Sequence, residues 1–400
     1  MIFKLALLNL FRNQRRSFVV LLIVALGASA IFMFHGFNAG IMNQYRDNTI
    51  KARYGFGQIF TKGYRDEIHD KPSEKWISDY GLLTRELLKQ KGVTQVFPRI
   101  NFHGMLSNGK RSIAGKGQGV DGKEEYKFFN TLNFVEGKNL SNEEDGIILG
   151  IGLAEGLGLK KGDLVTVLAN TVHGSLNGVD TYVTGIFHTG SKEFDDSVFR
   201  IQLSNAQDLL DTIKIESISL GLDSVDSWKS IETYIQSKGE YEAIPFHVLD
   251  KVYYQHSVDW LESQFGVIQL IILMIVILGI ISTVSTSIFE RKQEIGMLRA
   301  NGESKKGVFW LLCLEGIYLG VIGSAAGIFL SWVFNIAIIP DGILMPPAPG
   351  LTRQFFVKIE LAFQMAGKSF LLGVFTAGLA AIFSAIRVVT IPITEALRSN

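Results

Sequence analysis

The chain has 400 residues, of which 47% are hydrophobic and 19% are charged, and it contains 28 Phe. So apolar a composition excludes a purely soluble protein and indicates a membrane component. The 39 basic residues nearly balance the 38 acidic ones, so no overall positive field would attract nucleic acid. Cys313 is the single cysteine, which excludes an intramolecular disulfide and a cysteine-rich zinc site.

The apolar residues gather in four nearly uncharged blocks, each long enough, at about 20 residues, to cross a bilayer as a helix. The blocks are 17–37, 265–289, 308–339 and 369–389. In the first block, Ala28-Ser29-Ala30 resembles a signal-peptidase site. The apolar run continues past this site through Phe34, so we interpret the block as an uncleaved anchor. The sequence therefore predicts four transmembrane helices.

The basic residues indicate how these helices are oriented, because Lys and Arg in short loops stay on the cytoplasmic side. They precede the first block, recur between the second and third blocks, and follow the fourth. We therefore place both termini in the cytoplasm and most of the chain outside. The predicted division is 1–40, with the cytoplasmic N-terminal segment and first transmembrane helix; 41–263, outside; and 264–400, with three transmembrane helices and a short cytoplasmic helix at 290–300.

Between residues 41 and 263, short β-prone runs alternate with helical stretches, a mixture typical of an α+β domain. Predicted strands lie at 58–61, 95–99, 164–168, 182–187 and 217–222, and predicted helices at 73–91, 151–157, 204–213 and 224–238. Helical patterning also continues outward from the first two spans, which predicts two stalks. The fold class is thus an α-helical membrane protein with four transmembrane helices and a large α+β extracytoplasmic domain inserted between the first and second spans.

The sequence contains no evident catalytic or metal-binding constellation. Segment 117–124 nearly matches a phosphate-binding G-x-x-x-x-G-K-[ST] loop, but Glu124 replaces the hydroxyl residue that would bind magnesium. A turn leading into a helix at 125–132 is the favoured interpretation. The seven His lack paired spacing, and no G-x-S-x-G elbow supports a nucleophilic serine. We therefore predict a non-enzymatic protein with no catalytic residue and no metal or cofactor bound directly.

The segment between the second and third blocks is the most informative of the chain. Residues 290–300 suit a short helix, and Asn301-Gly302 suits its left-handed end. Ile295 and Leu298 form an apolar edge beside charged residues. Such a helix could dock on a cytoplasmic protein, although a solvated, positively charged connector would show the same pattern.

Two features stand out within the third block. Small residues recur along one helix face, at Gly316, Gly320, Gly323 and Gly327. This spacing lets another helix approach closely, so we expect the third span to pack against the fourth or across a dimer. Glu315 lies about 12 Å into the span by helical rise. Its carboxylate either forms a buried polar contact or reaches back to the cytoplasmic membrane–water interface. After this block, prolines within 340–349 predict a stiff, non-helical outer loop.

These residues resemble the FtsX-like permeases of ABC transporters, which include the macrolide exporter MacB and the lipoprotein-releasing permeases. The likeness rests on segments 6–16, 290–300 and 395–398 and, in the outer domain, on 150–154, 157–163 and 185–195. The chain has Ala300-Asn-Gly-Glu-Ser304 where the family usually has Ala-Leu-Gly-Ala-Ser, and its 392–396 segment lacks a frequent Asp-Pro pair. Both departures leave the identity of the ATPase partner open.

The resemblance implies a non-catalytic, multi-pass permease subunit of the bacterial inner membrane. It would pair with a second permease, as a homo- or heterodimer, and with cytoplasmic ABC ATPase subunits that bind the ATP and magnesium. Helix 290–300 would be the coupling helix. Its contacts with the ATPase would be Glu290, Glu294, Ile295, Leu298 and Arg299.

The resemblance also implies a function by mechanotransmission. ATP hydrolysis in the partner would drive extraction or export of a lipoprotein, lipid or other amphipathic cargo out of the membrane lipid. Cargo contacts would come from Phe32, Phe34, Phe37 and Phe265. The alternative is an FtsX-type regulatory transducer that activates an extracytoplasmic cell-wall hydrolase without transport. A periplasmic adaptor or cargo acceptor is a further partner of such systems.

Overall fold

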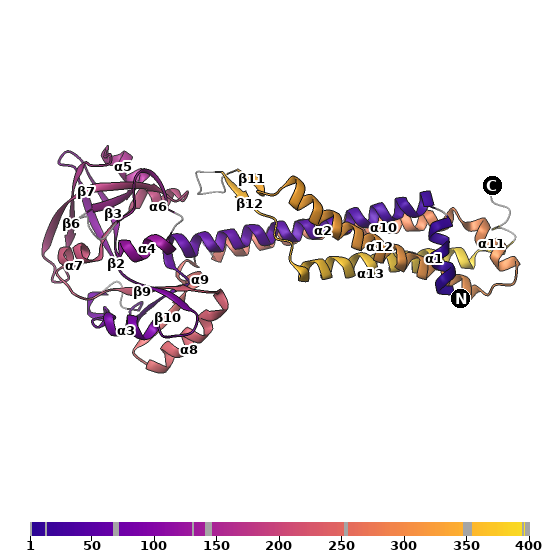
Figure 1. The fold of residues 1–400 in the computed structure, drawn as a ribbon, viewed down its shortest axis with the longest axis horizontal. Helices are drawn as coiled ribbons and strands as arrows, with labels where there is room; N and C mark the ends of the chain where they lie inside the picture. The colour runs from indigo at the N-terminus through magenta and orange to yellow at the C-terminus, as the bar shows by residue number, and fades with distance from the viewer. Residues whose placement is uncertain are drawn as a thin grey trace. The chain divides into compact units, whose positions relative to one another are not determined.

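The computed structural model describes residues 2–12, 14–66, 72–129, 132–140, 146–251, 255–346, 354–393 and 396. The chain divides into two compact units, whose elements are labelled in Figure 1. The helical unit comprises Met1–Asn43, Asp259–Met345 and Phe356–Asn400, and the strand-rich unit comprises Gln44–Val258 and Pro346–Phe355. Each unit has its own hydrophobic core.

Among the described residues, four helices are long and apolar enough to span a membrane, as predicted. They are α2 (Gln14–Thr49), α10 (His256–Phe289), α12 (Lys305–Ile338) and α13 (Phe363–Thr390). The short helix α1 (Ile2–Arg12) precedes α2, and α11 (Lys292–Ala300) joins α10 to α12. Both α2 and α10 extend beyond their apolar blocks, because the helical pattern continues there without a breaker.

Glycines allow α12 to approach two neighbouring helices closely. A Cβ added at Gly316 would overlap the Cβ of Ala381 on α13. Further along, a Cβ at Gly327 would overlap the carbonyl oxygen of Ala25 on α2. The four small residues on this face of α12 divide between the two helices. Gly316 and Gly320 lie against α13, and Gly323 and Gly327 lie against α2. The close approach therefore occurs within one chain, with α13 against the first part of this face of α12 and α2 against the next part.

Helix α10 is the least covered of the long helices. In its most apolar stretch 11% of the residues are buried, against 50% in α13. Its buried side chains, Ile280, Val284 and Ile288, all lie in its second half. The first half exposes a series of apolar side chains: Trp260, Val267, Ile268, Leu270 and Ile271. In a membrane this half of α10 meets lipid or another polypeptide.

The segment between α12 and α13 contains a small hairpin of β11 (Ile343–Met345) and β12 (Phe355–Val357). The chain that follows β12 packs on α2, where the Glu360 amide donates to the carbonyl of Gly36 at 3.0 Å. A Cβ at Gly40 would overlap the carbonyl oxygen of Lys358. Of the prolines predicted to stiffen this segment, Pro347 and Pro349 lie outside the described residues.

Six strands of the strand-rich unit close into a ring, because β6 pairs with both β2 and β7. In ring order they are β2 (Val93–Ser107), β3 (Ser112–Val120), β8 (Val198–Gln202), β5 (Gly146–Gly150), β7 (Leu176–His188) and β6 (Leu164–Asn170). The pairs β3–β8 and β5–β7 are parallel, and the other pairs are antiparallel. Strand β4 (Asn133–Gly137) adds to β7 outside the ring.

Strand β2 also belongs to a second, antiparallel sheet. Its first half pairs with β9 (Ser217–Leu222), which is followed by β1 (Gly57–Thr61) and β10 (Tyr241–Pro245). Figure 1 shows the ring and this smaller sheet as two lobes joined at β2. One core runs through both lobes and includes the fully buried Ile59, Ile100 and Phe199. The predicted α+β fold class is confirmed.

The helices of the strand-rich unit are short. They are α3 (Tyr80–Leu87), α4 (Gly122–Phe128), α5 (Ile151–Leu157), α6 (Lys192–Ser197), α7 (Leu203–Leu210), α8 (Trp228–Lys238) and α9 (Phe246–Leu249), with a π-helical turn η1 (Ile50–Tyr54) and 3₁₀ turns η2 (Pro72–Lys75) and η3 (Val225–Ser227). Helix α5 has the predicted bounds. Its end at Gly158 is left-handed, with φ +67°, which glycine adopts without strain.

The helix predicted at 204–213 is α7, which ends at Leu210, and the one predicted at 224–238 is divided into η3 and α8. Two further predicted helices differ from those observed. The helix predicted at 73–91 is divided into η2 and α3, because Ile77 forms a β-bridge with Ile215 and is buried. The helix predicted at 125–132 begins earlier, as α4, because the Asp121 side chain caps it by accepting from the Lys123 and Glu124 amides, each at 3.2 Å. The near-match to a phosphate loop is therefore a capped turn, as the sequence indicated.

The glycine contact predicts a specific pair of variants. Gly316→Ala should destabilise the full-length protein by about 1–3 kcal/mol, because the new methyl group overlaps Ala381. Adding Ala381→Gly should restore most of that loss. Thermal unfolding in detergent measures both effects. Gly367→Ala is the matched control, since nothing lies within 4 Å of a Cβ at that position; an equal loss in the control would contradict the contact.

Candidate functional site

The connector between α10 and α12 is held by a buried ion pair. Arg291, just before α11, donates from Nη1 to Oε2 of Glu315 on α12. Arg291 is 9% exposed and Glu315 is 6% exposed. The Nε of Arg291 also donates to Oε2 of Glu294 at 3.0 Å. Removing either partner of such a pair leaves a desolvated charge, so the pair restricts the connector to one arrangement.

Helix α1 joins the same network. Asn9 donates from Nδ2 to Oε1 of Glu315 at 2.7 Å, which satisfies the second carboxylate oxygen. Arg12 lies near Glu294, with Nη2 and Oε2 3.5 Å apart. Burial acts to raise the pKa of Glu294, but Arg291 and Arg12 outweigh burial and lower it. Glu294 is therefore charged at neutral pH and binds α11 to the N-terminal helix.

The two ends of the connector are tied to other helices. Arg16 on α2 forms an ion pair with Glu290, with Nε and Oε2 3.0 Å apart. At the far end, Arg299 donates from Nη1 to the carbonyl oxygens of Val389 at 3.0 Å and Ile391 at 2.6 Å. These carbonyls lie at the C-terminal end of α13, where the helix dipole favours a cation. The connector thus contacts α1, α2, α12 and α13.

Helix α11 has one buried and one exposed face. Ile295 is 2% exposed and lies in the core of the helical unit, with Leu298 packed against that core. Gln293, Met297 and Ala300 are exposed, and the Met297 side chain reaches 52% exposure. Their spacing of four and three places them on one stripe of the helix. The exposed stripe is the surface of α11 that a further polypeptide can reach.

The sequence singled out Glu290, Glu294, Ile295, Leu298 and Arg299, and all five contact other elements of the same chain. The structure adds Asn9, Arg291 and Met297. Asn9 and Arg291 meet Glu315 across 306 and 24 residues, so no local pattern reveals them. The available signal was an ionisable residue inside a span, which needs a partner. The resembling segment at 395–398 lies outside the described residues, except Ala396.

The predicted cargo residues lie on α2 and α10. Phe34 and Phe265 meet edge to face, with ring centroids 6.3 Å apart, whereas Phe32 is buried and Phe37 half-buried. The sequence reasoning missed a polar contact between the same helices, in which Nε2 of His35 and Nε2 of Gln269 lie 2.8 Å apart. Polar groups within a membrane are costly unless paired, so this contact holds the two spans together.

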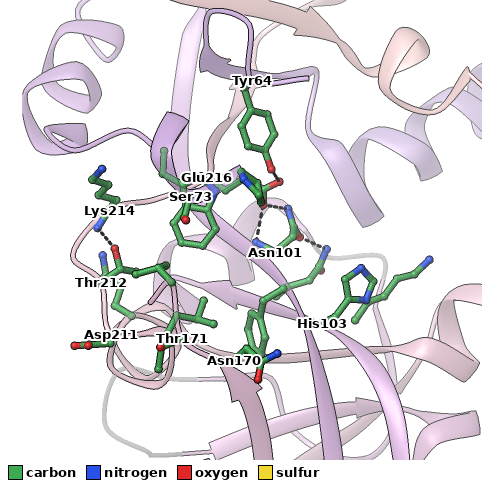
Figure 2. Close-up of a pocket in the computed structure, with 18 of the residues that line it drawn as sticks. Tyr64, Ser73, Asn101, His103, Asn170, Thr171, Asp211, Thr212, Lys214 and Glu216 are labelled. Carbon is green, nitrogen blue, oxygen red and sulfur yellow. Dashed lines mark hydrogen bonds between the residues drawn. The ribbon is translucent and has the colours of Figure 1, made fainter. Parts of the chain in front are cut away.

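The strand-rich unit contains a cavity of about 1780 Å³ (Figure 2). On its wall, Glu216 accepts from the Tyr64 hydroxyl and from Nδ2 of Asn101, each at 2.7 Å. A further hydrogen bond joins Gln118 to this group, because Gln118 donates to Oδ1 of Asn101 at 3.1 Å. Burial raises the pKa of Glu216, and burial together with Glu216 raises that of Tyr64. Among the described residues, no group of three or more His, Cys, Asp or Glu could hold a metal ion.

The chain has four apolar spans, an α+β unit inserted after the first span, and a connector helix, α11, that contacts the spans. These features define a multi-pass membrane protein. Two family models match it: the MacB-like periplasmic core domain over residues 17–238 and the FtsX-like permease C-terminal domain over residues 266–393. The chain belongs to the FtsX-like family of ABC transporter permeases with a MacB-like periplasmic core domain. It is a non-catalytic transmembrane subunit that works with an ATPase partner, as predicted.

Curated relatives of similar length are distant. The chain is 24% identical over 341 residues to the lipoprotein-releasing system transmembrane protein LolC of Neisseria meningitidis, covering 80% of this chain and 79% of the relative. It is 24% identical over 292 residues to LolE of Haemophilus influenzae, covering 68% of each. The solved periplasmic region of MacB from Actinobacillus actinomycetemcomitans matches 48% of this chain and 90% of that structure, at 16% identity and a TM-score of 0.36.

The buried ion pair leads to a prediction about stability. Glu315→Leu should destabilise the full-length protein by about 3–5 kcal/mol, because it leaves the Arg291 guanidinium short of its buried partner. The double variant Arg291→Met with Glu315→Leu should recover much of the loss, because no unpaired charge remains. Glu303→Leu, at an exposed position after α11, is the control. Thermal unfolding separates the three, and a Glu315 variant no less stable than the control would contradict the pair.

Proposed function

We propose that this chain is the mechanical subunit of an ABC transporter that extracts or exports a lipoprotein, lipid or other amphipathic cargo. The observation that carries the proposal is the construction of α11. Together with Glu290 and Arg291 just before it, α11 is tied on its inner side to α1, α2, α12 and α13, and its outer stripe is exposed. A partner that displaces the open stripe therefore displaces all of these helices together.

The proposed ATPase contact is the exposed stripe of α11. Met297 supplies an unbranched apolar side chain that can enter a groove, and Gln293 supplies amide hydrogen bonds. Glu294, Ile295 and Arg299 lie on the inner face of α11 and hold it to the other helices of the unit. They therefore pass a movement of α11 on to the spans. This assignment refines the contact set that the resemblance implied for residues 290–300.

The proposed orientation puts both termini and the connector in the cytoplasm and segment 41–263 outside the bacterial inner membrane. The basic residues support it, because they gather before α2, in the connector and after α13. In this orientation α11 faces the compartment that contains ATP.

The proposed cargo route runs along α2 and α10, between this chain and a second permease. It is supported by the uncovered apolar half of α10, which in the single chain has few neighbours. Phe34 and Phe265 lie on these two helices and contact each other, so they are placed to touch an acyl chain. The distant relatives LolC and LolE, whose names describe lipoprotein release, favour a lipidated cargo.

If the exposed stripe is the ATPase contact, substitutions at two similarly exposed methionines should affect ATPase binding differently. Met297→Asp should weaken co-purification of the co-expressed ATPase by roughly ten-fold or more, since it places a charge in an apolar contact. Met105→Asp is the control, because Met105 is 47% exposed, close to the 52% of Met297, but lies on β2 of the strand-rich unit. Equal recovery of the ATPase with both variants would count against α11 as the contact.

The cargo is tested in proteoliposomes that hold the permease, its ATPase and a fluorescent triacylated lipoprotein. We expect lipoprotein to leave the vesicles for a soluble acceptor when ATP is added, and to stay when a non-hydrolysable analogue replaces ATP. ATP hydrolysis without any lipoprotein movement, together with activation of a cell-wall hydrolase bound to the strand-rich unit, would replace transport by the regulatory alternative.

A further inference from the structure

Helix α2 ends in an unusual way within the strand-rich unit. It passes directly into the π-helical turn η1, and the Gly55 amide closes that turn by donating to the carbonyl of Ile50 at 3.0 Å. Gly55 has φ +65°, and a Cβ there would lie 2.5 Å from the carbonyl oxygen of Leu220 on β9. The Phe56 amide donates to that same carbonyl at 2.8 Å. The helix end is therefore seated against the sheet.

Two buried arginines hold the last carbonyls of this helix end. Arg99 on β2 donates from Nη1 to the carbonyl of Arg53, and Arg200 on β8 donates from Nη2 to the carbonyl of Ala52 at 3.0 Å. The two arginines are 1% and 2% exposed. Carbonyls at a helix C-terminus lack helical partners and carry partial negative charge, so each guanidinium meets a complementary group.

Glu125 on α4 joins the two arginines. It accepts from Nε of Arg99 at 2.5 Å, and its Oε2 lies 3.7 Å from Nη1 of Arg200. The Arg99 guanidinium also lies over the Phe129 ring, 4.1 Å from its centroid. Burial, reinforced by Arg99 and opposed by Glu125, lowers the pKa of Arg200 to about 10. Arg200 therefore keeps its charge at neutral pH.

This cluster is an expensive way to fill a core. Two buried cations share one buried anion, and apolar side chains of the same volume would avoid the desolvation cost. Apolar side chains, however, could not bond the carbonyls of Ala52 and Arg53, because they have no donors. A planar guanidinium provides several donors in fixed directions. The cluster thus exchanges stability for a fixed angle between the helix end and two strands.

The cluster also reaches the cavity wall. Arg200 donates from Nε to Oε1 of Gln118 at 2.9 Å, and Gln118 donates to Asn101, which bonds to Glu216. The helix end is therefore connected by hydrogen bonds through β8, β3 and β2 to the residue before β9. Both lobes of the strand-rich unit share this connection.

We propose that Arg99, Glu125 and Arg200 are positioning residues that form a rigid joint between the end of α2 and the strand-rich unit. Movement of α2 is passed through this joint to both lobes, instead of being absorbed at a flexible hinge. The proposal rests on the mechanical function proposed above, for which it names the element that transmits motion to the outer domain.

The joint is tested by measuring one distance in the full-length permease in nanodiscs. Spin labels are attached at Asn48→Cys on α2 and Lys110→Cys in the β2–β3 turn, both exposed, in a Cys313→Ala background. Pulsed EPR should give a single narrow distance distribution that does not change when ATP and its ATPase are added. An ATP-dependent distance in the unmodified joint would overturn the proposal.

The decisive variant replaces the cluster by apolar groups, as Arg99→Met, Glu125→Leu and Arg200→Met together. No unpaired charge remains, so the fold is retained while the bonds to the helix end are lost. We expect the distance distribution to broaden. We also expect lipoprotein release to fall roughly ten-fold, equivalent to about 1.4 kcal/mol of coupling, while ATP hydrolysis continues. A distribution as narrow as that of the parent would refute the joint.

Two further variants keep the test decisive. Lys238→Met removes an ion pair with Glu86 elsewhere in the strand-rich unit and should leave the distance and the release unchanged. If the triple variant does not elute as a single species, Arg200→Lys takes its place, since lysine cannot bond Gln118 and Ala52 in the same geometry; an unchanged distribution then refutes the joint. Because the distance is measured without cargo, failure of the transport assay alone counts against the proposed function and not against the joint.

Discussion

A charge removed from water must meet a partner, and this constraint determines where the buried charges of the chain lie. In the helical unit, Arg291 and Glu315 meet beside the connector helix, and Asn9 completes the shell of the carboxylate. In the strand-rich unit, Arg99 and Arg200 meet Glu125 and the last carbonyls of a helix. Both clusters lie at a junction between secondary-structure elements: one beside the connector between α10 and α12, the other at the end of α2. An unpaired buried charge would destabilise the fold by several kcal/mol, so each of these junctions has one preferred geometry.

The apolar parts of the chain follow a different rule, because lipid provides no hydrophobic force between helices. Close contact then depends on small side chains, and α12 uses Gly316 against α13 and Gly327 against α2. Helix α10 has few such contacts in its first half, where its apolar side chains stay exposed. The helical unit therefore combines a tightly packed part, formed by α12, α13 and part of α2, with one helix whose apolar side chains are free to meet lipid or another polypeptide.

Local signals predicted well where a residue's own neighbours decide its structure. Helix α5 has the predicted bounds because Gly158 ends it, and the spans follow from uninterrupted apolar runs. Prediction failed at 73–91, where a distant strand residue, Ile215, pairs with Ile77 and breaks the helical pattern. For the candidate site, the sequence located the connector but not its two faces. Ile295 and Met297 are both apolar and two residues apart, and only their surroundings distinguish the buried one from the exposed one.

The sequence by itself determined the class of the molecule: four spans, an α+β insertion and a connector whose motif matches FtsX-like permeases. These properties depend on composition, periodicity and short motifs, all of which are local. The tertiary structure alone decided which residues meet: Asn9 with Glu315 across 306 positions, the ring closed by β6, and the two arginines on the end of α2. Such contacts depend on how separate elements pack, and no spacing along the chain encodes them directly.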